Sequence, residues 1–201
     1  MVNDINLIID EVFGLYQKYG NADYIGEPVS QLEHMSQSAQ LAIDEGYDDE
    51  IVLAAFFHDI GHICVMQNQD NSMDGYGVKS HEKIGADFLR AKGFPETIAK
   101  LVEYHVQAKR YLTYKYPAYY AHLSEASKKT LEFQGGVMQD EEAEIFQNNP
   151  LFEISILIRK WDELAKETNL PIISMDQLKH KAKTILEKAI ALNGCNSTSP
   201  R

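Results

Sequence analysis

Apolar side chains recur along most of the chain at the three- and four-residue spacing of helices, and the alternation typical of strands is nearly absent. The first apolar stripe lies between a capping residue, Asp4, and Gly20, and it consists of Ile8, Ile9, Val12 and Leu15. Later segments repeat this period. The pattern therefore predicts an all-α protein.

Two capping boxes predict where further helices begin. Ser30 with Glu33, and Ser174 with Gln177, indicate helices that start at about residues 31 and 175. Other helices are expected to end at Gly46, Gly93 and Gly194 and to have Pro95 and Pro150 in their first turns. The remaining loops are residues 21–29, residues 65–79 and an irregular stretch around residues 111–120.

Composition favours one compact domain. The chain has 201 residues, of which 44% are apolar, and no linker-like run precedes residue 190. We expect a single-domain helical bundle over residues 1–192, followed by a disordered polar tail at residues 193–201. Without an apolar run of membrane-spanning length or a secretory leader pattern, the chain is predicted to be cytoplasmic. Cys64 and Cys195 form neither a CxxC motif nor a disulfide framework, so thiolate metal ligands are not expected.

The net charge of −11 argues against nucleic-acid binding, because most of the surface would repel a phosphate backbone. Basic residues nevertheless gather in the second half of the chain, at Lys109, Arg110, Lys115, Lys128, Lys129 and Arg159. Some of them could line an anion pocket, although solvated surface positions are the simpler explanation for most of them taken singly.

Four histidines recur at intervals of 24, 23 and 24 residues, namely His34, His58, His81 and His105. This is the spacing of one metal ligand per helix. Two carboxylates accompany them, because Asp59 directly follows His58 and Asp162 lies in an otherwise apolar helix. Six nitrogen and oxygen ligands are more than one ion needs, so the sequence predicts a two-metal site in the core of the bundle.

The helix face that each of these residues occupies supports the prediction. His58 and His105 each complete an apolar stripe, the first after Ile51, Ala54 and Ala55 and the second after Ile98, Leu101 and Val102. A single buried histidine is usually a hydrogen-bonded core residue. A buried carboxylate, by contrast, requires a cation or a raised pKa. Six inward-facing polar side chains together therefore indicate metal.

The expected division of ligands makes Asp59 a bridge. One ion would take His34, His58, Asp59 and Asp162, and the other His81, His105 and the shared Asp59, with coordination positions left open. His81 should begin a helix after Ser80, where the helix dipole favours the neutral, ligating imidazole. Such a site suits non-haem iron and its oxygen chemistry, and it equally suits manganese or zinc ions that activate water against a phosphate ester.

The ordered set of ligands resembles the H…HD…D signature of the HD-domain superfamily, and His81 and His105 match the two additional histidines of its binuclear members. The resemblance extends over about residues 20–170. Most members of the superfamily are phosphohydrolases. A smaller branch, which includes myo-inositol oxygenase, uses a mixed-valent Fe(II)/Fe(III) pair and O2.

Within that branch the chain resembles the PhnZ-like phosphonate oxygenases, through the strings NADYIGEPVSQLEH and FFHDIGH together with Lys109 and Arg159. The resemblance implies two iron ions and the conversion of (R)-2-amino-1-hydroxyethylphosphonate and O2 into glycine and phosphate. It also implies that Tyr24 covers the open iron until substrate displaces it, and that Glu27 pairs with the substrate ammonium. Without the resemblance, both are ordinary loop residues before a helix cap.

Further substrate contacts are expected beside the ligands. Lys109 lies four residues after His105, and Arg159 lies three residues before Asp162, so each is one helical turn from a ligand and within reach of a phosphonate. The resemblance implies that His62 and Ser127 also help to hold the substrate. An Arg159 that only pairs with Asp162 is the main structural alternative.

Two rival functions remain open. A binuclear HD phosphohydrolase acting on a nucleotide or phosphomonoester would use the same ligands, but Tyr24 and Glu27 favour the oxygenase because a covered metal hinders a water-activating site. A nucleotide-sensing or nucleic-acid-binding module would use the run RYLTYKYPAYY, although core packing explains its tyrosines more simply. No membrane and no obligate protein partner is implied. His122 and His180 are assigned no role.

Overall fold

The computed structural model describes residues 4–24, 26–65 and 71–196, with side chains described as far as residue 192. This part of the chain forms eleven α-helices and two isolated bridges, Asp23 to Ser30 and Ser72 to Val78. The prediction of an all-α, single-domain bundle is confirmed. No helix in the described ranges has both the length and the apolar composition needed to cross a bilayer.

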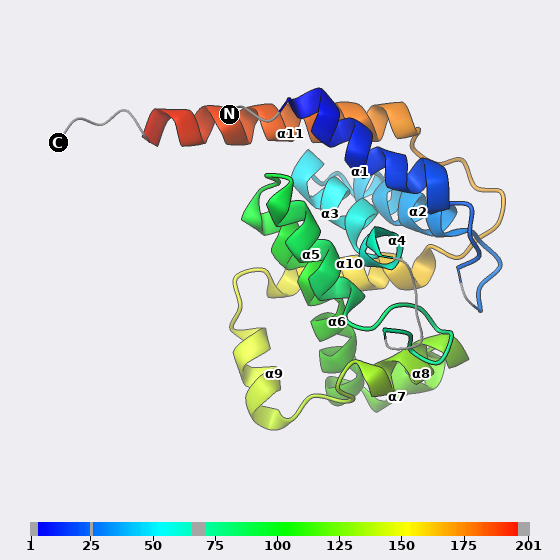
Figure 1. Cartoon of the computed structure of the whole chain (residues 1–201). Coiled ribbons are helices and arrows are strands. Elements are labelled where there is room, and N and C mark those ends of the chain that lie inside the picture. Colours follow the sequence, from blue (N-terminus) through cyan, green and yellow to red (C-terminus); the bar gives the residue numbers. More distant parts are fainter. Residues whose placement is uncertain (1–3, 25, 66–70, 197–201) are drawn as a thin grey trace.

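The helices, in chain order, are α1 (Ile5–Tyr19), α2 (Gln31–Asp44), α3 (Asp49–Phe57), α4 (Gly61–Cys64), α5 (His81–Ala91), α6 (Glu96–Lys115), α7 (Pro117–His122), α8 (Glu125–Phe133), α9 (Asp140–Gln147), α10 (Phe152–Leu164) and α11 (Met175–Asn196). α1 and α11 lie side by side along one edge of the molecule, next to α2 and α3 (Figure 1). α7 and α8 lie at the opposite end, and α5, α6 and α10 lie between these two layers (Figure 1).

The side chains predicted to cap α1, α2 and α11 all bond backbone N–H groups in the first turn, namely Asp4, Ser30 and Ser174. At α2 the bonding is reciprocal. The Ser30 hydroxyl accepts from the Glu33 N–H (3.2 Å), and the Glu33 carboxylate accepts from the Ser30 N–H (2.8 Å). Gly46 and Gly93 follow the ends of α2 and α5, as predicted.

The prediction of an irregular stretch around residues 111–120 is wrong. α6 continues to Lys115, and α7 begins at Pro117 after one intervening residue, Tyr116. Tyr111 and Thr113 are buried in this part of α6. Packing of these side chains overrides the modest helix propensity of aromatic and β-branched residues.

Three other helix boundaries differ from the prediction. Pro95 is the residue that caps α6, and Pro150 directly precedes Leu151, the cap of α10, so neither proline lies inside a first turn. α11 continues through Gly194 to Asn196, because a glycine inside a helix costs only about 1 kcal/mol. Residues 197–201 of the predicted tail and residues 66–70 of a predicted loop lie outside the described residues.

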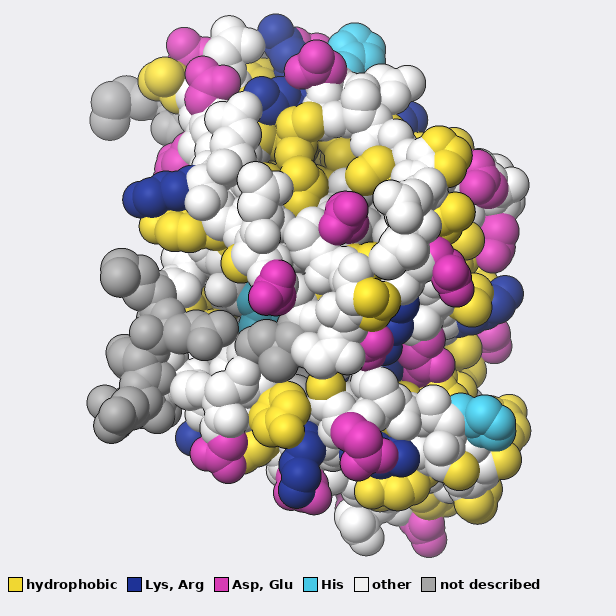
Figure 2. Space-filling model, turned by 90° about the vertical axis from the view of Figure 1, so that its right-hand side faces the viewer, with side chains coloured by type: hydrophobic (Ala, Val, Ile, Leu, Met, Phe, Trp, Pro, Cys, Tyr) yellow, Lys and Arg dark blue, Asp and Glu magenta, His cyan; other side chains and the backbone are white. Residues whose placement is uncertain are grey.

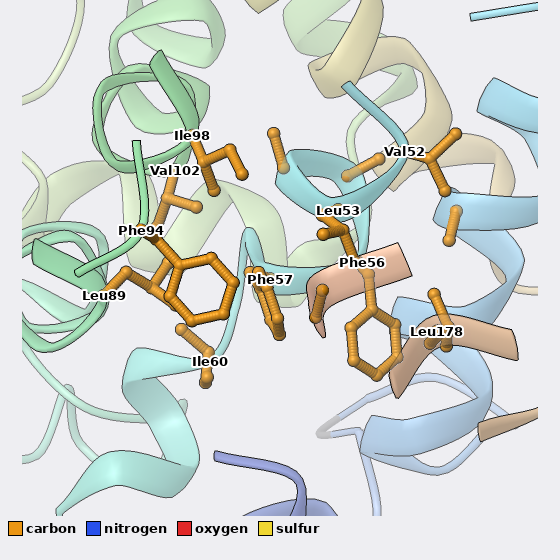
Figure 3. Close-up of a cluster of buried hydrophobic side chains, with 14 of the residues drawn as sticks. Val52, Leu53, Phe56, Phe57, Ile60, Leu89, Phe94, Ile98, Val102 and Leu178 are labelled. Atoms are coloured by element: carbon orange, nitrogen blue, oxygen red, sulfur yellow. The ribbon is translucent and has the colours of Figure 1, made fainter. Parts of the chain in front are cut away.

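The hydrophobic core is centred on α3, whose residues from Val52 to Phe57 are fully buried. α3 is apolar on every side because it packs against α2, α6, α10 and α11. Phe57 points toward Phe94 and Ile60, whereas Phe56 points toward Leu178 on α11 (Figure 3). This close-packed layer fixes the position of the turn that immediately follows α3.

Candidate metal centre

The four evenly spaced histidines and the two predicted aspartates converge inside the bundle. They comprise His34 on α2, His58 and Asp59 in the turn after α3, His81 at the start of α5, His105 in the middle of α6 and Asp162 on α10. Each of these residues is at most 3% exposed. Polar side chains buried this deeply require partners that compensate their charge.

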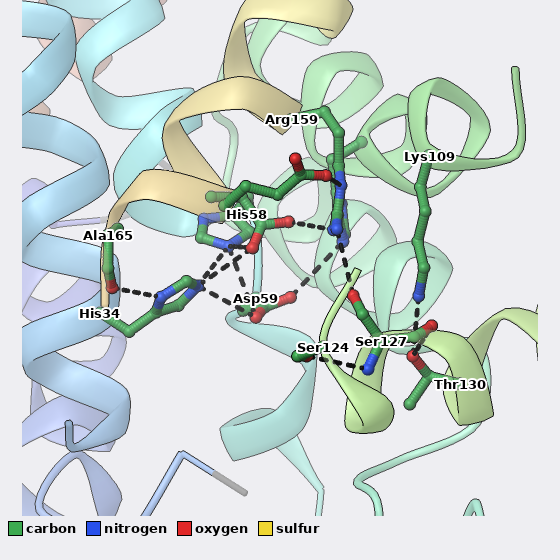
Figure 4. A network of polar contacts seen from close by, with 12 residues as sticks. His34, His58, Asp59, Lys109, Ser124, Ser127, Thr130, Arg159 and Ala165 are labelled. Atoms are coloured by element: carbon green, nitrogen blue, oxygen red, sulfur yellow. Dashed lines mark hydrogen bonds and ion pairs between the residues drawn. The ribbon is translucent and has the colours of Figure 1, made fainter. Parts of the chain in front are cut away.

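One group of ligand atoms lies on the α2 side of the cluster (Figure 4). Nε2 of His34 is 3.0 Å from Nε2 of His58. Both nitrogens face Oδ2 of Asp59, at 3.7 Å and 3.4 Å respectively. Oδ1 of Asp162 completes the group, 3.5 Å from Nε2 of His34.

A second group lies on the other side of Asp59. Nε2 of His81 is 3.1 Å from Nε2 of His105, and these atoms are 3.2 Å and 3.4 Å from Oδ1 of Asp59. Each oxygen of Asp59 therefore faces one pair of imidazoles. This is the grouping expected for two ions with Asp59 between them.

Backbone carbonyls fix the second ring nitrogen of all four histidines. Each Nδ1 lies 2.6 to 3.3 Å from a carbonyl oxygen, and these carbonyls belong to Ala165, Ala55, Val78 and Val102. An Nδ1–H that donates to a carbonyl leaves Nε2 with an unprotonated lone pair. The four lone pairs therefore point into the cluster.

The donor set fits a binuclear metal centre. Facing lone pairs at 3.0 Å and 3.1 Å repel each other unless a proton or a cation lies between them. Two ligands at a right angle on a metal with bonds of about 2.1 Å are separated by about 3.0 Å. Imidazole nitrogens and carboxylate oxygens at this spacing suit iron, manganese or zinc.

The charges of the cluster also favour a cation. Burial lowers the pKa of His58, but the charges of Asp59 and Asp162 together with the Ala55 carbonyl outweigh this effect. The resulting pKa of His58 is about 9. Burial raises the pKa of both carboxyl groups, yet His58 at Asp59 and Arg159 at Asp162 hold these pKa values well below the ordinary range. Protons therefore compete with metal for this cluster.

Tyr24 covers the α2 side of the cluster. Its ring stacks on the imidazole of His34, with a centroid separation of 3.9 Å and an interplanar angle of 13°. Burial, followed by the charge of Asp59, raises the pKa of Tyr24 well above its usual value. Tyr24 thus lies against the cluster and close enough to the shared carboxylate for its charge to act on the hydroxyl. The expectation that Tyr24 covers the ion bound by His81 and His105 stays a prediction.

His62 lies beside the second group. Its ring stacks on His81 at 4.0 Å, and its Nδ1 accepts the Val78 N–H (3.1 Å). Burial, and next the charge of His81, lowers the pKa of His62 to about 3, so the ring is neutral with its proton on Nε2, 4.0 Å from Asp59 Oδ1. A Cβ at Gly77 would lie 2.6 Å from this ring, so only glycine fits there.

Lys109 points into a cavity next to the cluster (Figure 4). Lys109 is 2% exposed, and its Nζ donates to two neutral acceptors, Thr130 Oγ1 (2.7 Å) and Gln134 Oε1 (2.9 Å). Within the described ranges, no carboxylate forms an ion pair with it. Burial, and next the charge of Arg159, holds the pKa of Lys109 well below its ordinary value. A buried amine without a counter-ion is suited to binding an anion.

Arg159 connects the metal cluster with the cavity (Figure 4). Its Nη1 bonds Asp162 Oδ2 (2.5 Å), and its Nη2 donates to Ser127 Oγ (3.1 Å). Nε donates to Glu163 (2.8 Å) and to the Tyr119 hydroxyl (2.9 Å), and that hydroxyl also bonds Glu163. The pairing of Arg159 with Asp162 is therefore present, and it leaves Nη2 on the cavity wall.

Glu27 already has a cationic partner. Nζ of Lys166 lies 2.6 Å from Glu27 Oε1, and the two side chains are 21% and 12% exposed. Glu27 is predicted to pair with a substrate ammonium, and a lysine ammonium of the protein itself holds it in this structure.

One small cavity, of about 60 Å³, collects all the predicted substrate contacts, which are Tyr24, Glu27, His62, Lys109, Ser127 and Arg159. Its wall also contains residues that the sequence did not single out, including Gln31, Thr130, Gln134 and Lys166. Thr130 and Gln134 follow Ser127 by three and seven residues, so the helical spacing of α8 could have indicated them. Nothing in the sequence indicates Gln31 or Lys166.

The other basic residues that the sequence singled out, and the two unassigned histidines, do not line the cavity. Arg110 bonds Glu142 (2.9 Å), and Lys128 bonds Glu125 (2.8 Å). The remaining members of this set are exposed, namely Lys115, Lys129, His122 and His180. On the face drawn in Figure 2, acidic and basic side chains are interspersed.

The tyrosine-rich run has structural contacts. Tyr111 packs in a small cluster with Ala108, Met138, Ala143 and Phe146. The Tyr114 hydroxyl donates to Asp140 (2.9 Å), and Tyr119 contacts Arg159. Core packing and positioning of Arg159 therefore account for these rings.

Comparison with known proteins identifies the class that this bundle and its histidine–aspartate cluster define. The HD domain family model matches residues 31–147. The chain belongs to the HD-domain family.

Three relatives extend this similarity over most of the chain. An uncharacterised protein of Acanthamoeba polyphaga mimivirus is 43% identical over 88% of this chain and 78% of its own length. The [1-hydroxy-2-(trimethylamino)ethyl]phosphonate dioxygenase (glycine-betaine-forming) of Leisingera caerulea is 40% identical over 81% of this chain and 82% of its own. The hydroxymethylphosphonate dioxygenase of Gimesia maris is 34% identical over 89% of this chain and 88% of its own. The relatives with an assigned activity are thus phosphonate dioxygenases.

Proposed function

We propose that this chain is a di-iron oxygenase that cleaves the carbon–phosphorus bond of a small 1-hydroxyphosphonate with O2. The observation that carries the proposal is the similarity to two dioxygenases, each over more than four fifths of this chain. Both of their named substrates carry a hydroxyl group on the carbon bonded to phosphorus. We take (R)-2-amino-1-hydroxyethylphosphonate, converted to glycine and phosphate, as the first candidate substrate.

The cluster would hold a mixed-valent Fe(II)/Fe(III) pair. His34, His58, Asp59 and Asp162 would bind one iron, and His81, His105 and Asp59 the other. When bound, such a pair supplies open coordination positions and the redox chemistry that O2 activation requires.

Lys109 and Arg159 would bind the phosphonate. The buried Lys109 lacks an acidic partner, so a phosphonate oxygen would supply the missing negative charge and raise the pKa of Lys109 toward its ordinary value. Arg159 Nη2 and the Ser127 hydroxyl form an adjacent part of the same wall. Contacts of this kind orient the carbon–phosphorus bond relative to the ligand cluster.

Tyr24 and His62 would act on either side of Asp59. Tyr24 covers the shared carboxylate and would exclude water until a ligand enters. The Nε2–H of His62 is a neutral donor held toward Asp59, and it would donate to a substrate oxygen. Glu27 would face the amino end of the substrate.

The phosphohydrolase alternative uses the same metal ligands, but its reaction consumes different co-substrates. Cleavage of the hydroxyphosphonate consumes one O2, and all four electrons come from the substrate, so no other reductant is used. Hydrolysis of a phosphate ester consumes water and no O2. The small cavity favours a compact phosphonate over a nucleotide.

The test is O2 uptake by protein reconstituted with Fe(II), partly oxidised, and given (R)-2-amino-1-hydroxyethylphosphonate without other reductant. We expect substrate-dependent uptake with glycine and phosphate formed in equal amounts to the O2 consumed. His105→Ala should lower the rate by more than about 100-fold, since a ligand of the open ion is lost. His122→Ala is the matched control, because His122 is exposed and does not line the cavity.

Two results would reject the proposal. One is phosphate release from a nucleotide or phosphomonoester without O2 uptake, which would establish the hydrolase. The other is the absence of uptake, by protein shown to contain two irons, with each of the 2-amino, 2-trimethylamino and hydroxymethyl phosphonates.

A further inference from the structure

The Glu27–Lys166 ion pair occupies the part of the cavity wall where an ammonium group of the substrate is expected. Its two charged atoms are 2.6 Å apart, and both residues line the cavity. Lys109 and Ser127 line the same cavity from other elements, α6 and α8. The wall therefore combines an unpaired cationic site with a carboxylate that is already neutralised.

The backbone on both sides of Lys166 is fixed to α2. The carbonyl of Ala165 accepts from Nδ1 of His34 (2.9 Å). Glu167 exchanges two hydrogen bonds with the side-chain amide of Gln37, at 2.7 Å and 3.2 Å. The side chain of Lys166 thus extends from a rigid segment, and the ion pair is preorganised rather than a chance contact of a surface lysine.

Glu27 is held in place from its own side. Its N–H donates to the carbonyl of Tyr24 (2.9 Å), and the Tyr24 N–H donates to the Val29 carbonyl (3.0 Å). The turn thus places Glu27 next to the residue that covers the cluster.

Gln31 provides a further acceptor on the cavity wall. Its residue is 8% exposed, and its Oε1 has no hydrogen-bond partner. Among the described residues, four buried side-chain atoms lack a partner, and Gln31 alone of these residues lines the cavity. An unpaired buried acceptor costs about 1–3 kcal/mol, which an N–H donor of a ligand would recover.

We infer that Lys166 is a specificity-determining residue, whose ion pair with Glu27 sets how strongly the cavity prefers a phosphonate bearing an ammonium group over one without it. The inference rests on the proposed function, because it concerns the phosphonate bound by Lys109 and Arg159. A carboxylate beside a lysine ammonium attracts a second cation less strongly than a free carboxylate does. The named substrates of the two dioxygenases differ in this group, since one carries a trimethylamino group and the other carries none.

Binding of two isosteric ligands tests this without turnover. 2-Aminoethylphosphonate carries an ammonium where propylphosphonate carries a methyl group, so the ratio of their dissociation constants isolates the ammonium. Calorimetric titration would compare the wild-type protein with Lys166→Met. We expect the preference for 2-aminoethylphosphonate to increase about tenfold in Lys166→Met, equivalent to about 1.4 kcal/mol.

Three matched variants separate charge from structure. Lys166→Arg keeps a positive charge at this position, so the ratio of dissociation constants should stay within about twofold of the wild-type ratio. Lys160→Met removes a lysine near the end of α10, six residues before Lys166, and because Lys160 is exposed and outside the cavity the ratio should not change. In a Glu27→Gln background, Lys166→Met should no longer alter the ratio, because the carboxylate it would release is absent.

The possible failures are distinguishable. If both ligands bind and Lys166→Met leaves the ratio unchanged or lowers it, the inference is wrong while the proposed phosphonate site stands. If neither ligand binds the wild-type protein, the phosphonate site itself is rejected and the inference with it. Thermal unfolding would establish that each variant is folded, and Lys166→Gln removes the same charge if Lys166→Met does not fold.

Discussion

Lys109 shows how burial prepares a single side chain for a ligand. Its amine is 2% exposed, and both of its partners, Thr130 and Gln134, are neutral acceptors. Arg159, by contrast, is bonded to Asp162 and Glu163, so its charge is largely compensated inside the protein. Of these two cations, Lys109 gains more from an incoming anion.

The lowered pKa of Lys109 gives anion binding a defined pH dependence. The ammonium form of Lys109 predominates only below its pKa, and burial has lowered that pKa. The affinity for a phosphonate should therefore fall as the pH rises, and the fall should begin at a pH below the ordinary lysine pKa. Propylphosphonate titrations at increasing alkaline pH, up to the ordinary lysine pKa of about 10.4, would show this loss. Lys109→Met should weaken binding about 30-fold, or about 2 kcal/mol, in neutral solution.

Lys109→Arg is the control for this prediction, because a guanidinium keeps its charge throughout that pH range. Its affinity should be nearly independent of pH in the alkaline range. An identical alkaline loss in the wild-type protein and in Lys109→Arg would show that another group causes it.

At the level of helices, the close approach of α4 to α5 holds His81 in place. A Cβ on Gly61 would lie 1.9 Å from the backbone oxygen of His81 and 2.6 Å from its carbonyl carbon. From the other helix, a Cβ on Gly85 would lie 2.9 Å from Ile60. Small residues on both helices therefore let the first residue of α5 reach the cluster.

Gly61→Ala should consequently separate α4 from α5 and displace His81. We expect a loss of about 3 kcal/mol in the free energy of unfolding, measured with urea, and a reduced content of bound metal. Gly14→Ala is the matched control, because nothing lies within 4 Å of a Cβ at Gly14 in α1. That substitution should raise the free energy of unfolding by up to about 1 kcal/mol. Equal stability of the two variants would contradict the packing argument.

For the whole molecule, the histidine–aspartate cluster is a buried polar connection between helices that also pack together through the apolar core. Its members join α2, the end of α3, α5, α6 and α10, near the middle of the bundle. Without cations, two carboxylates and facing imidazole lone pairs are buried together. The stability of the bundle should therefore depend on metal.

Metal removal with a chelator should lower the unfolding temperature by about 10 °C, a shift that corresponds to about 4 kcal/mol of binding free energy in a chain of this size. Asp162→Asn should reduce the difference between metal-loaded and metal-free protein, since it removes one charged member of the cluster. His180→Ala, an exposed substitution on α11, should leave that difference intact. An unchanged unfolding temperature in protein shown to be free of metal would refute this expectation.

The parts of the site that could be predicted are those encoded by local pattern. His58 and His105 each complete an apolar stripe, so their inward direction followed from the helical period. The Glu27–Lys166 pair could not be predicted, because its members are 139 positions apart and meet only through the packing of the segment after α10 on α2. Tyr119 was missed for a related reason, because its contact with Arg159 depends on α7, which was expected to be irregular.

The order of the cluster along the chain has a consequence for synthesis of the protein. Five of its members occur between His34 and His105, whereas Asp162, with its partner Arg159, comes only on α10. During translation the cluster is therefore incomplete until most of the chain has left the ribosome. A product truncated before α10 would retain the four histidines and Asp59 but would lack Asp162, so it could not complete the centre.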